Sequence, residues 1–222
     1  MSSSAHPCWP NAGFIWRILL PVAAVVFVAA CGDKSAKEQA LSPGSMVVAL
    51  GDSLTAGAGV AREQAWPDLL AGRTGWEVVN AGVNGDTSGG ALERLPALLE
   101  EHEPVLVLVA LGGNDMLRRI PQEQTVANLG KMLDMIMAHG AKPVLLATPE
   151  PSVAGAVFQS LSAADFYRSV AEAHQVPLIE DAIAEVLSDP AMKGDPLHPN
   201  AAGHAQLAQK IFDALKSIGH AF

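Results

Sequence analysis

Short apolar runs alternate along this chain with segments of helical periodicity, and this alternation most restricts the fold. Five runs, mostly apolar and rich in β-branched residues, are typical of buried strands: 47–50, 77–80, 105–111, 143–147 and 176–179. Apolar stripes at helical spacing follow them: Leu92, Leu95, Leu98 and Leu99; Leu129, Met132, Leu133 and Ile136; Phe166, Val170 and Ala173; Leu207, Ile211, Ala214 and Leu215. The pattern predicts a three-layer α/β/α sandwich around a five-stranded parallel sheet.

Composition and charge restrict the class of protein. The chain has 222 residues, enough for one domain with a short appendage, and shows no internal repeat. Its formal charge is −9 and no Lys or Arg run occurs, so we expect no nucleic-acid partner. The only cysteines, Cys8 and Cys31, lie in the first 31 residues, so the body of the chain has no disulfide and no thiolate nucleophile.

The N-terminal segment has the features of an export signal. Arg17 precedes an apolar run over 18–30, which is shorter than the roughly 20 residues of a membrane span. The run ends in Val-Ala-Ala before Cys31 and resembles a bacterial lipobox. We therefore expect a lipoprotein-type signal peptide at 1–30, lipidated Cys31, a polar tether over 31–45 and a folded domain over 46–222, on the periplasmic side of the envelope. A plain signal cut near Ala30, giving a soluble periplasmic or secreted protein, and an uncleaved anchor are the alternatives.

A candidate nucleophile follows the first predicted strand. Ser53 stands in Gly51-Asp52-Ser53-Leu54, just past the strand, where open α/β sheets present reactive groups. Flanking glycines permit a sharp turn and close approach by a substrate. Alternatively, Ser53 is only a helix N-cap.

Two further loops follow neighbouring strands at the same edge. The stretch 80–88 (NAGVNGDTS) holds two glycines, whose loop can aim a backbone N–H into a shared cleft. Asn114 follows Gly112-Gly113 and can donate its side-chain amide to a developing oxyanion. The alternatives are a loop in which Asp86 or Ser88 caps the next helix, and a plain Gly-Gly-Asn turn.

An acid and a histidine stand three residues apart near the C-terminus. Pro196 keeps the Asp195–His198 segment out of helix, so both side chains can face one side of a turn. Asp195 could then orient one imidazole nitrogen while the other reaches Ser53. A Pro-rich loop with a surface histidine is the alternative. The other histidines have no acid at useful spacing, and no His-x-x-x-His pair indicates a metal site.

Together these motifs resemble the GDSL/SGNH hydrolases, whose four blocks are matched here by GDSLTAG (51–57), NAGVNGDTS (80–88), LGGND (111–115) and DPLHPN (195–200). The resemblance implies a flavodoxin-like fold and a monomeric, cofactor-free enzyme for small or lipid-like esters. It implies Ser53 as nucleophile, His198 as general base and Asp195 as its orienting acid. The implied oxyanion hole is the Ser53 N–H, the Gly85 N–H (Gly82 being the fallback) and the Asn114 side chain. Asp52 and Asp115 are expected to shape their turns.

Within this family, the stretches 65–70, 78–99 and 108–118 resemble the bacterial thioesterase I / lysophospholipase L1 / arylesterase branch. The resemblance implies an esterase, with thioesters and lysophospholipids as further substrates. A carbohydrate O-deacetylase and a non-catalytic envelope-binding lipoprotein are the alternatives. The segment 149–166 departs from the branch, because Glu150 stands between two prolines, so the acyl-chain preference stays open.

Overall fold

The computed structural model describes residues 40–151 and 159–222. The predicted signal peptide, the lipidation at Cys31 and most of the predicted tether therefore lie outside the described residues. None of the helices built by the described residues has the length and apolar character that crossing a bilayer requires.

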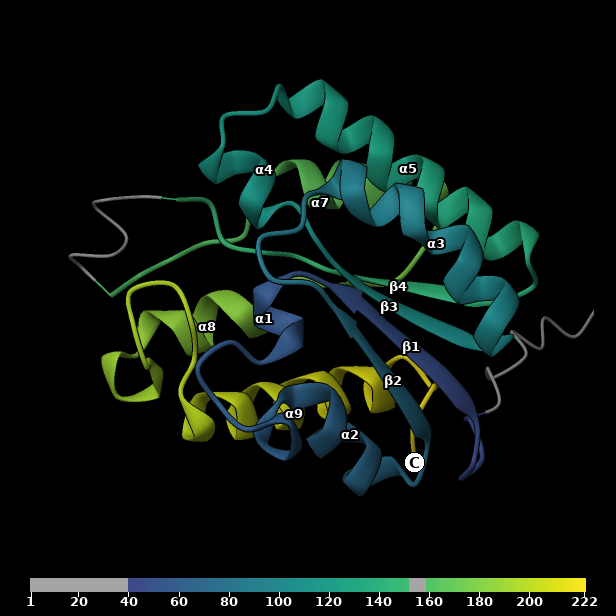
Figure 1. Ribbon diagram of the computed structural model, residues 1–222, viewed down its shortest axis with the longest axis horizontal. Coiled ribbons are helices and arrows are strands. Elements are labelled where there is room, and N and C mark those ends of the chain that lie inside the picture. Colours follow the sequence, from purple (N-terminus) through teal and green to yellow (C-terminus); the bar gives the residue numbers. More distant parts are fainter. Residues whose placement is uncertain (1–39, 152–158) are drawn as a thin grey trace, which may run out of the picture. The chain divides into compact units, whose positions relative to one another are not determined.

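The described chain is built on one five-stranded sheet in which all neighbouring strands are parallel (Figure 1). Its order is β2-β1-β3-β4-β5, which confirms the predicted fold class. The strands are β1 (Met46–Gly51), β2 (Glu77–Gly82), β3 (Leu106–Ala110), β4 (Lys142–Leu146) and β5 (Leu178–Ile179). From β1 the chain passes first to β2 on one side and later to β3 on the other side of β1. In parallel sheets of this kind ligands bind where the strand order reverses, which here is at the carboxyl ends of β1 and β3.

Helices cover both faces of the sheet (Figure 1). On one face α3 (Ser88–His102), α5 (Gln122–Ala138) and α7 (Phe166–His174) pack on Val48, Leu50, Val107 and Val109. On the other, α2 (Trp66–Thr74), α8 (Ala182–Ser188) and α9 (Ala201–Ser217) pack on Val47, Ala49, Leu106 and Leu108. Successive strand residues thus point to opposite faces, and both faces are buried, as the continuous apolar runs predict.

The helical stripes predicted from spacing are correct in most positions. Leu95 and Leu99 are buried in α3, but Leu92 and Leu98 are only partly buried at the margin of that stripe. In α7 the prediction for Ala173 is wrong, because Ala173 is exposed and Ala171 occupies the buried position. The helices α2 and α8 were not predicted, because α2 contains Pro67 and Gly72, which favour turns, and α8 buries five of its seven residues and so shows no polar face beside an apolar stripe.

Candidate active site

Ser53 opens a single-turn helix, α1 (Ser53–Ala56), directly after β1. The Asp52 carboxylate caps this helix by accepting from the Leu54 N–H at 2.9 Å, and Gly57 ends it in a left-handed conformation. Gly51 is required at the turn, because a Cβ there would lie 2.0 Å from Thr55 Oγ1 and 3.0 Å from the Ala110 carbonyl oxygen. The strand, cap and tight turn fix the Ser53 hydroxyl at the carboxyl edge of the sheet.

His198 belongs to a short loop, residues 193–199, between the 3₁₀ helix η2 (Pro190–Met192) and α9. Asp195 Oδ1 accepts from the backbone N–H groups of Leu197 (2.7 Å) and His198 (2.9 Å), which forms the compact turn that Pro196 favours. The Gly194 N–H donates to the His198 carbonyl at 2.9 Å and closes the loop. The loop therefore holds Asp195 and His198 in a fixed relation.

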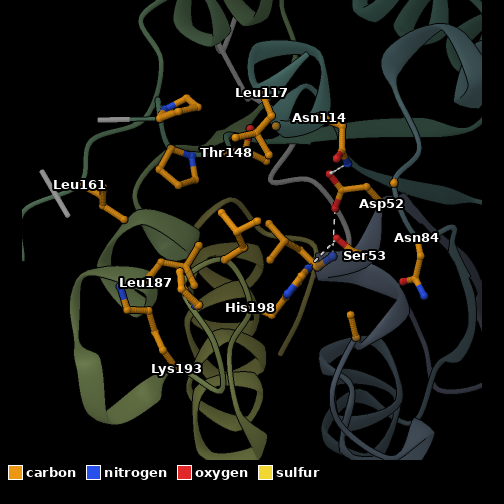
Figure 2. A pocket seen from close by; sticks show the side chains of 18 of the residues that line it. Asp52, Ser53, Asn84, Asn114, Leu117, Thr148, Leu161, Leu187, Lys193 and His198 are labelled. Atoms are coloured by element: carbon orange, nitrogen blue, oxygen red, sulfur yellow. Dashed lines mark hydrogen bonds between the residues drawn. The ribbon is translucent and has the colours of Figure 1, made fainter. Parts of the chain in front are cut away.

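The structure brings Ser53, His198 and Asp195 into one hydrogen-bonded series, of which Figure 2 shows the contact between His198 and Ser53. His198 Nε2 lies 3.0 Å from Ser53 Oγ, although the residues are 145 positions apart. His198 Nδ1 lies 2.8 Å from Asp195 Oδ2. The bond from His198, with the Leu197 N–H, holds the pKa of Asp195 below its usual range, so this carboxyl stays ionised beside the imidazole.

Asn114 lies at the start of α4 (Gly113–Leu117), on the side of the site above Asp52 (Figure 2). One Nδ2 proton is donated to Asp52 Oδ2 at 3.0 Å, which leaves the second free to face a ligand. Asp52 is only 2% exposed, and this burial raises its pKa to about 6 against the opposing hydrogen bond from Leu54. Asp52 thus connects the turn that carries Ser53 to the turn that carries Asn114.

Gly85 and Gly82 occupy different environments. Gly85 has a φ of +76° and lines the same cavity as Ser53. Gly82 ends β2 against α1, where a Cβ would lie 2.1 Å from the Ala56 nitrogen. The geometry therefore favours Gly85 over Gly82 as the source of an N–H directed at a ligand.

Arg94 joins these segments, and sequence reasoning missed it. Its guanidinium donates to the carbonyl oxygens of Gly51 (3.0 Å) and Ala81 (2.8 Å) and to Asp86 Oδ2 (2.9 Å). One side chain thereby ties the end of β1 to the end of β2 and to the loop that carries Gly85. The sequence does contain a signal for this role: Arg94 stands on the otherwise apolar side of 91–99. An arginine on the buried side of a helix needs hydrogen-bond acceptors that are buried with it.

The capping alternatives proposed for 80–88 are wrong. Thr87 caps α3, because its side chain accepts from the Gly90 N–H at 3.3 Å. Asp86 binds Arg94 instead, and Ser88 donates to Asp115 Oδ1 at 2.5 Å. Asp115 also accepts from the Ser88 N–H and from Thr125, so it connects the starts of α3, α4 and α5.

The other histidines lie outside this series. His174 Nδ1 lies 2.8 Å from Asp134 Oδ1, a partner 40 residues away that sequence spacing did not show. His204 is fully buried in α9, and burial lowers its pKa to about 4. Within residues 40–151 and 159–222, no three His, Cys, Asp or Glu side chains gather as a metal site requires.

A cavity of about 710 Å³ opens over Ser53 and His198 (Figure 2). Much of its wall is apolar, from side chains after several strands: Leu54, Leu117, Pro149, Pro151, Leu161, Leu187, Pro196 and Leu197. Asn84, Glu150 and Lys193 also line it. Sequence reasoning singled out Glu150 but neither Lys193 nor the leucines, because side chains from distant loops converge only in the folded chain. A cavity of this size and character suits an organic molecule with an apolar part.

The hydroxyl, imidazole and carboxylate at the carboxyl edge of this α/β sheet have the arrangement that serine-dependent hydrolases use. Residues 49–206 match the GDSL-like lipase/acylhydrolase family. The chain is 40% identical over 174 residues to thioesterase 1/protease 1/lysophospholipase L1 of Escherichia coli K12, covering 76% of this chain and 82% of that protein. It is 36% identical over 175 residues to an arylesterase of Vibrio mimicus, covering 76% and 87%.

A crystal structure of TesA superposes with a TM-score of 0.71 at 34% identity, over 78% of this chain and 99% of that one. The chain therefore belongs to the GDSL-like lipase/acylhydrolase family, and it is a carboxylic ester hydrolase.

Proposed function

We propose that this protein is a serine esterase that cleaves carboxylic esters through an acyl-enzyme on Ser53. The observation that supports this most strongly is the 3.0 Å approach of His198 Nε2 to Ser53 Oγ, with Asp195 2.8 Å from the other ring nitrogen. If Nδ1–H donates to Asp195, Nε2 is the acceptor that a serine proton needs.

The reaction then has two steps. Ser53 Oγ attacks the ester carbonyl carbon while His198 Nε2 takes the hydroxyl proton, and Asp195 stabilises the imidazolium. The tetrahedral oxyanion binds the N–H groups of Ser53 and Gly85 and the free Nδ2 proton of Asn114. Collapse of this intermediate expels the alcohol, which receives the proton from His198. Water activated by His198 then attacks the acyl-Ser53 ester and releases the acid and the free hydroxyl.

The apolar wall of the cavity supports an ester with an apolar substituent. A sugar O-acetyl group would present hydroxyls that leucine and proline side chains cannot bind, so a carbohydrate O-deacetylase fits less well. The names of the relatives extend the proposal to aryl esters, thioesters and lysophospholipids.

A substrate series tests the proposal. Purified protein is expected to hydrolyse p-nitrophenyl esters from C2 to C16, with a preference for acyl chains longer than acetyl. Ser53→Ala should abolish hydrolysis while the circular dichroism spectrum stays the same, because only one oxygen atom is removed. Full activity of Ser53→Ala would rule out the acyl-enzyme, and inactive wild-type protein on every ester would favour a non-catalytic binding role.

We further propose that the protein is exported and anchored to the envelope by lipid on Cys31. The apolar run at 18–30 and the small residues before Cys31 support this. Cys31→Ser should move the protein from the membrane fraction to the soluble fraction, with esterase activity retained. Membrane association of Cys31→Ser would contradict lipidation and favour an uncleaved anchor.

A further inference from the structure

Lys193 is held rigidly at the wall of the active-site cavity. Its N–H donates to the Pro190 carbonyl (3.3 Å), and its own carbonyl accepts from Asn200 Nδ2 (3.2 Å). Lys193 also pairs with Pro199 across the neck of the 193–199 loop. Lys193 thus lies directly opposite Pro199, the residue that follows His198. The backbone of Lys193 is therefore fixed relative to the catalytic imidazole.

The Lys193 ammonium has no ion-pair partner in the part of the chain that the structure describes. The Asp195 carboxylate, two residues further along the chain, is occupied by His198 and two backbone N–H groups. Glu150 lines the same cavity without pairing with Lys193. An ammonium of this kind is available to a ligand.

An apolar wall accompanies Lys193. In Figure 2, Lys193, Leu187 and Leu161 lie at the end of the cavity away from Asn84, and Ser53 and His198 lie between. Leucine side chains favour the hydrocarbon part of a substrate but cannot satisfy a charged group. With a net charge of −9, the chain as a whole repels anions, so an anionic ligand needs a local cation.

We propose that this end of the cavity binds the substituent of an ester that ends in an anionic group, a carboxylate or a phosphate, held by Lys193. The hydrocarbon between that group and the scissile carbonyl packs on Leu187 and Leu161. This inference rests on the proposed esterase function and specifies its substrate class.

The test compares matched anionic and neutral substrates by their kcat/KM ratio. On the acyl side the pair is mono-4-nitrophenyl adipate and 4-nitrophenyl hexanoate. On the alcohol side, 5-(butyryloxy)pentanoate and 5-(butyryloxy)pentyl phosphate are each compared with pentyl butyrate in a pH-stat. Because each ratio is measured on one protein sample, incomplete folding of a variant cancels.

Lys193→Met is expected to lower the anionic-to-neutral ratio about tenfold in at least one series, the loss that a charge-assisted hydrogen bond implies. The wild-type ratio should also fall as ionic strength rises. Lys131→Met removes the same charge from an exposed site on α5 and should leave the ratio unchanged. Glu150→Gln removes the opposing charge from the cavity and should raise the ratio or leave it unchanged.

The substrate series whose ratio falls in Lys193→Met shows whether the anionic group lies on the acyl side or the alcohol side of the ester. Within the alcohol series, comparison of the two anionic substrates shows whether Lys193 binds a carboxylate or a phosphate. Equal ratios in wild type and Lys193→Met across all series would overturn the anion site but leave the esterase proposal standing, since the neutral esters are still cleaved. Wild-type protein that cleaves no ester would overturn both.

Discussion

Asp52→Asn is expected to make the protein more stable and less active. Asp52 is 2% exposed, and its pKa rises from 3.8 to about 6 because burial disfavours the charged form. Between these two values the folded state binds more protons than the unfolded state, so the free energy of unfolding falls as pH rises. Above pH 6 the ionised carboxylate is a full cost to stability, and the Asn side chain carries no such cost.

The size of the effect follows from the shift of about two pKa units, which corresponds to about 3 kcal/mol. The variant side chain must turn its amide oxygen to the Leu54 N–H, so its amino group faces Asn114 Nδ2, and this lost hydrogen bond costs about 1 kcal/mol. We therefore expect a net gain of about 2 kcal/mol at pH 7. The value of kcat should fall about tenfold or more, because Asn114 loses the acceptor that orients it.

Urea unfolding of both proteins between pH 4 and pH 8 measures the difference. The advantage of Asp52→Asn should grow by about 2 kcal/mol from pH 4 to pH 6 and become nearly constant above about pH 7. Asp115→Asn is the matched control: this buried carboxylate accepts from three donors (the Ser88 N–H, the Ser88 hydroxyl and the Thr125 hydroxyl), against two at Asp52, so the loss of hydrogen bonds should dominate and destabilise the protein. A stability difference that does not vary with pH would refute the reasoning for Asp52.

Three further predictions concern single residues. Asn114→Ala should lower kcat by roughly 10²–10³ with little change in KM, and steady-state kinetics showing a change in KM alone would contradict its oxyanion role. Gly51→Ala should destabilise the protein by about 2 kcal/mol or more in urea unfolding, because its Cβ would lie 2.0 Å from Thr55 Oγ1; a wild-type midpoint would contradict this. Burial lowers the His204 pKa from 6.5 to about 4, so the unfolded state binds the extra proton and up to about 3 kcal/mol of stability is lost as pH falls from 6.5 to 4. His204→Leu should remove this loss, and an unchanged pH profile of unfolding would count against it.

The sheet could be predicted because both of its faces are covered. Burial on two sides makes a strand such as β3 apolar at every position, which is visible without knowledge of its neighbours. The helices α2 and α8 gave no such signal, since α2 carries a proline and a glycine and α8 is buried over most of its length. The error at Ala173 arose because three positions over nine residues do not fix the centre of a buried stripe: α7 buries Ala171 and leaves Ala173 in solvent.

The candidate site could be predicted where a reactive residue type directly follows a strand or lies close in sequence to its partner. Ser53 and Asn114 each follow a strand at the carboxyl edge of the sheet, and Asp195 lies three residues before His198. Contacts between distant segments were not predictable, since no local pattern links their members. Arg94 with the Gly51 carbonyl, 43 residues away, and Lys193 at the cavity wall are examples.

Covalent labelling tests the central claim most directly. A reactive alkyl phosphonate places a tetrahedral phosphorus on an activated serine, so it reports the nucleophile itself. Peptide mass spectrometry should find one adduct per chain, on Ser53, appearing in step with the loss of esterase activity. His198→Ala should slow this labelling strongly, because the hydroxyl loses its base. An adduct on another residue, or complete inhibition while Ser53 stays unmodified, would contradict the account.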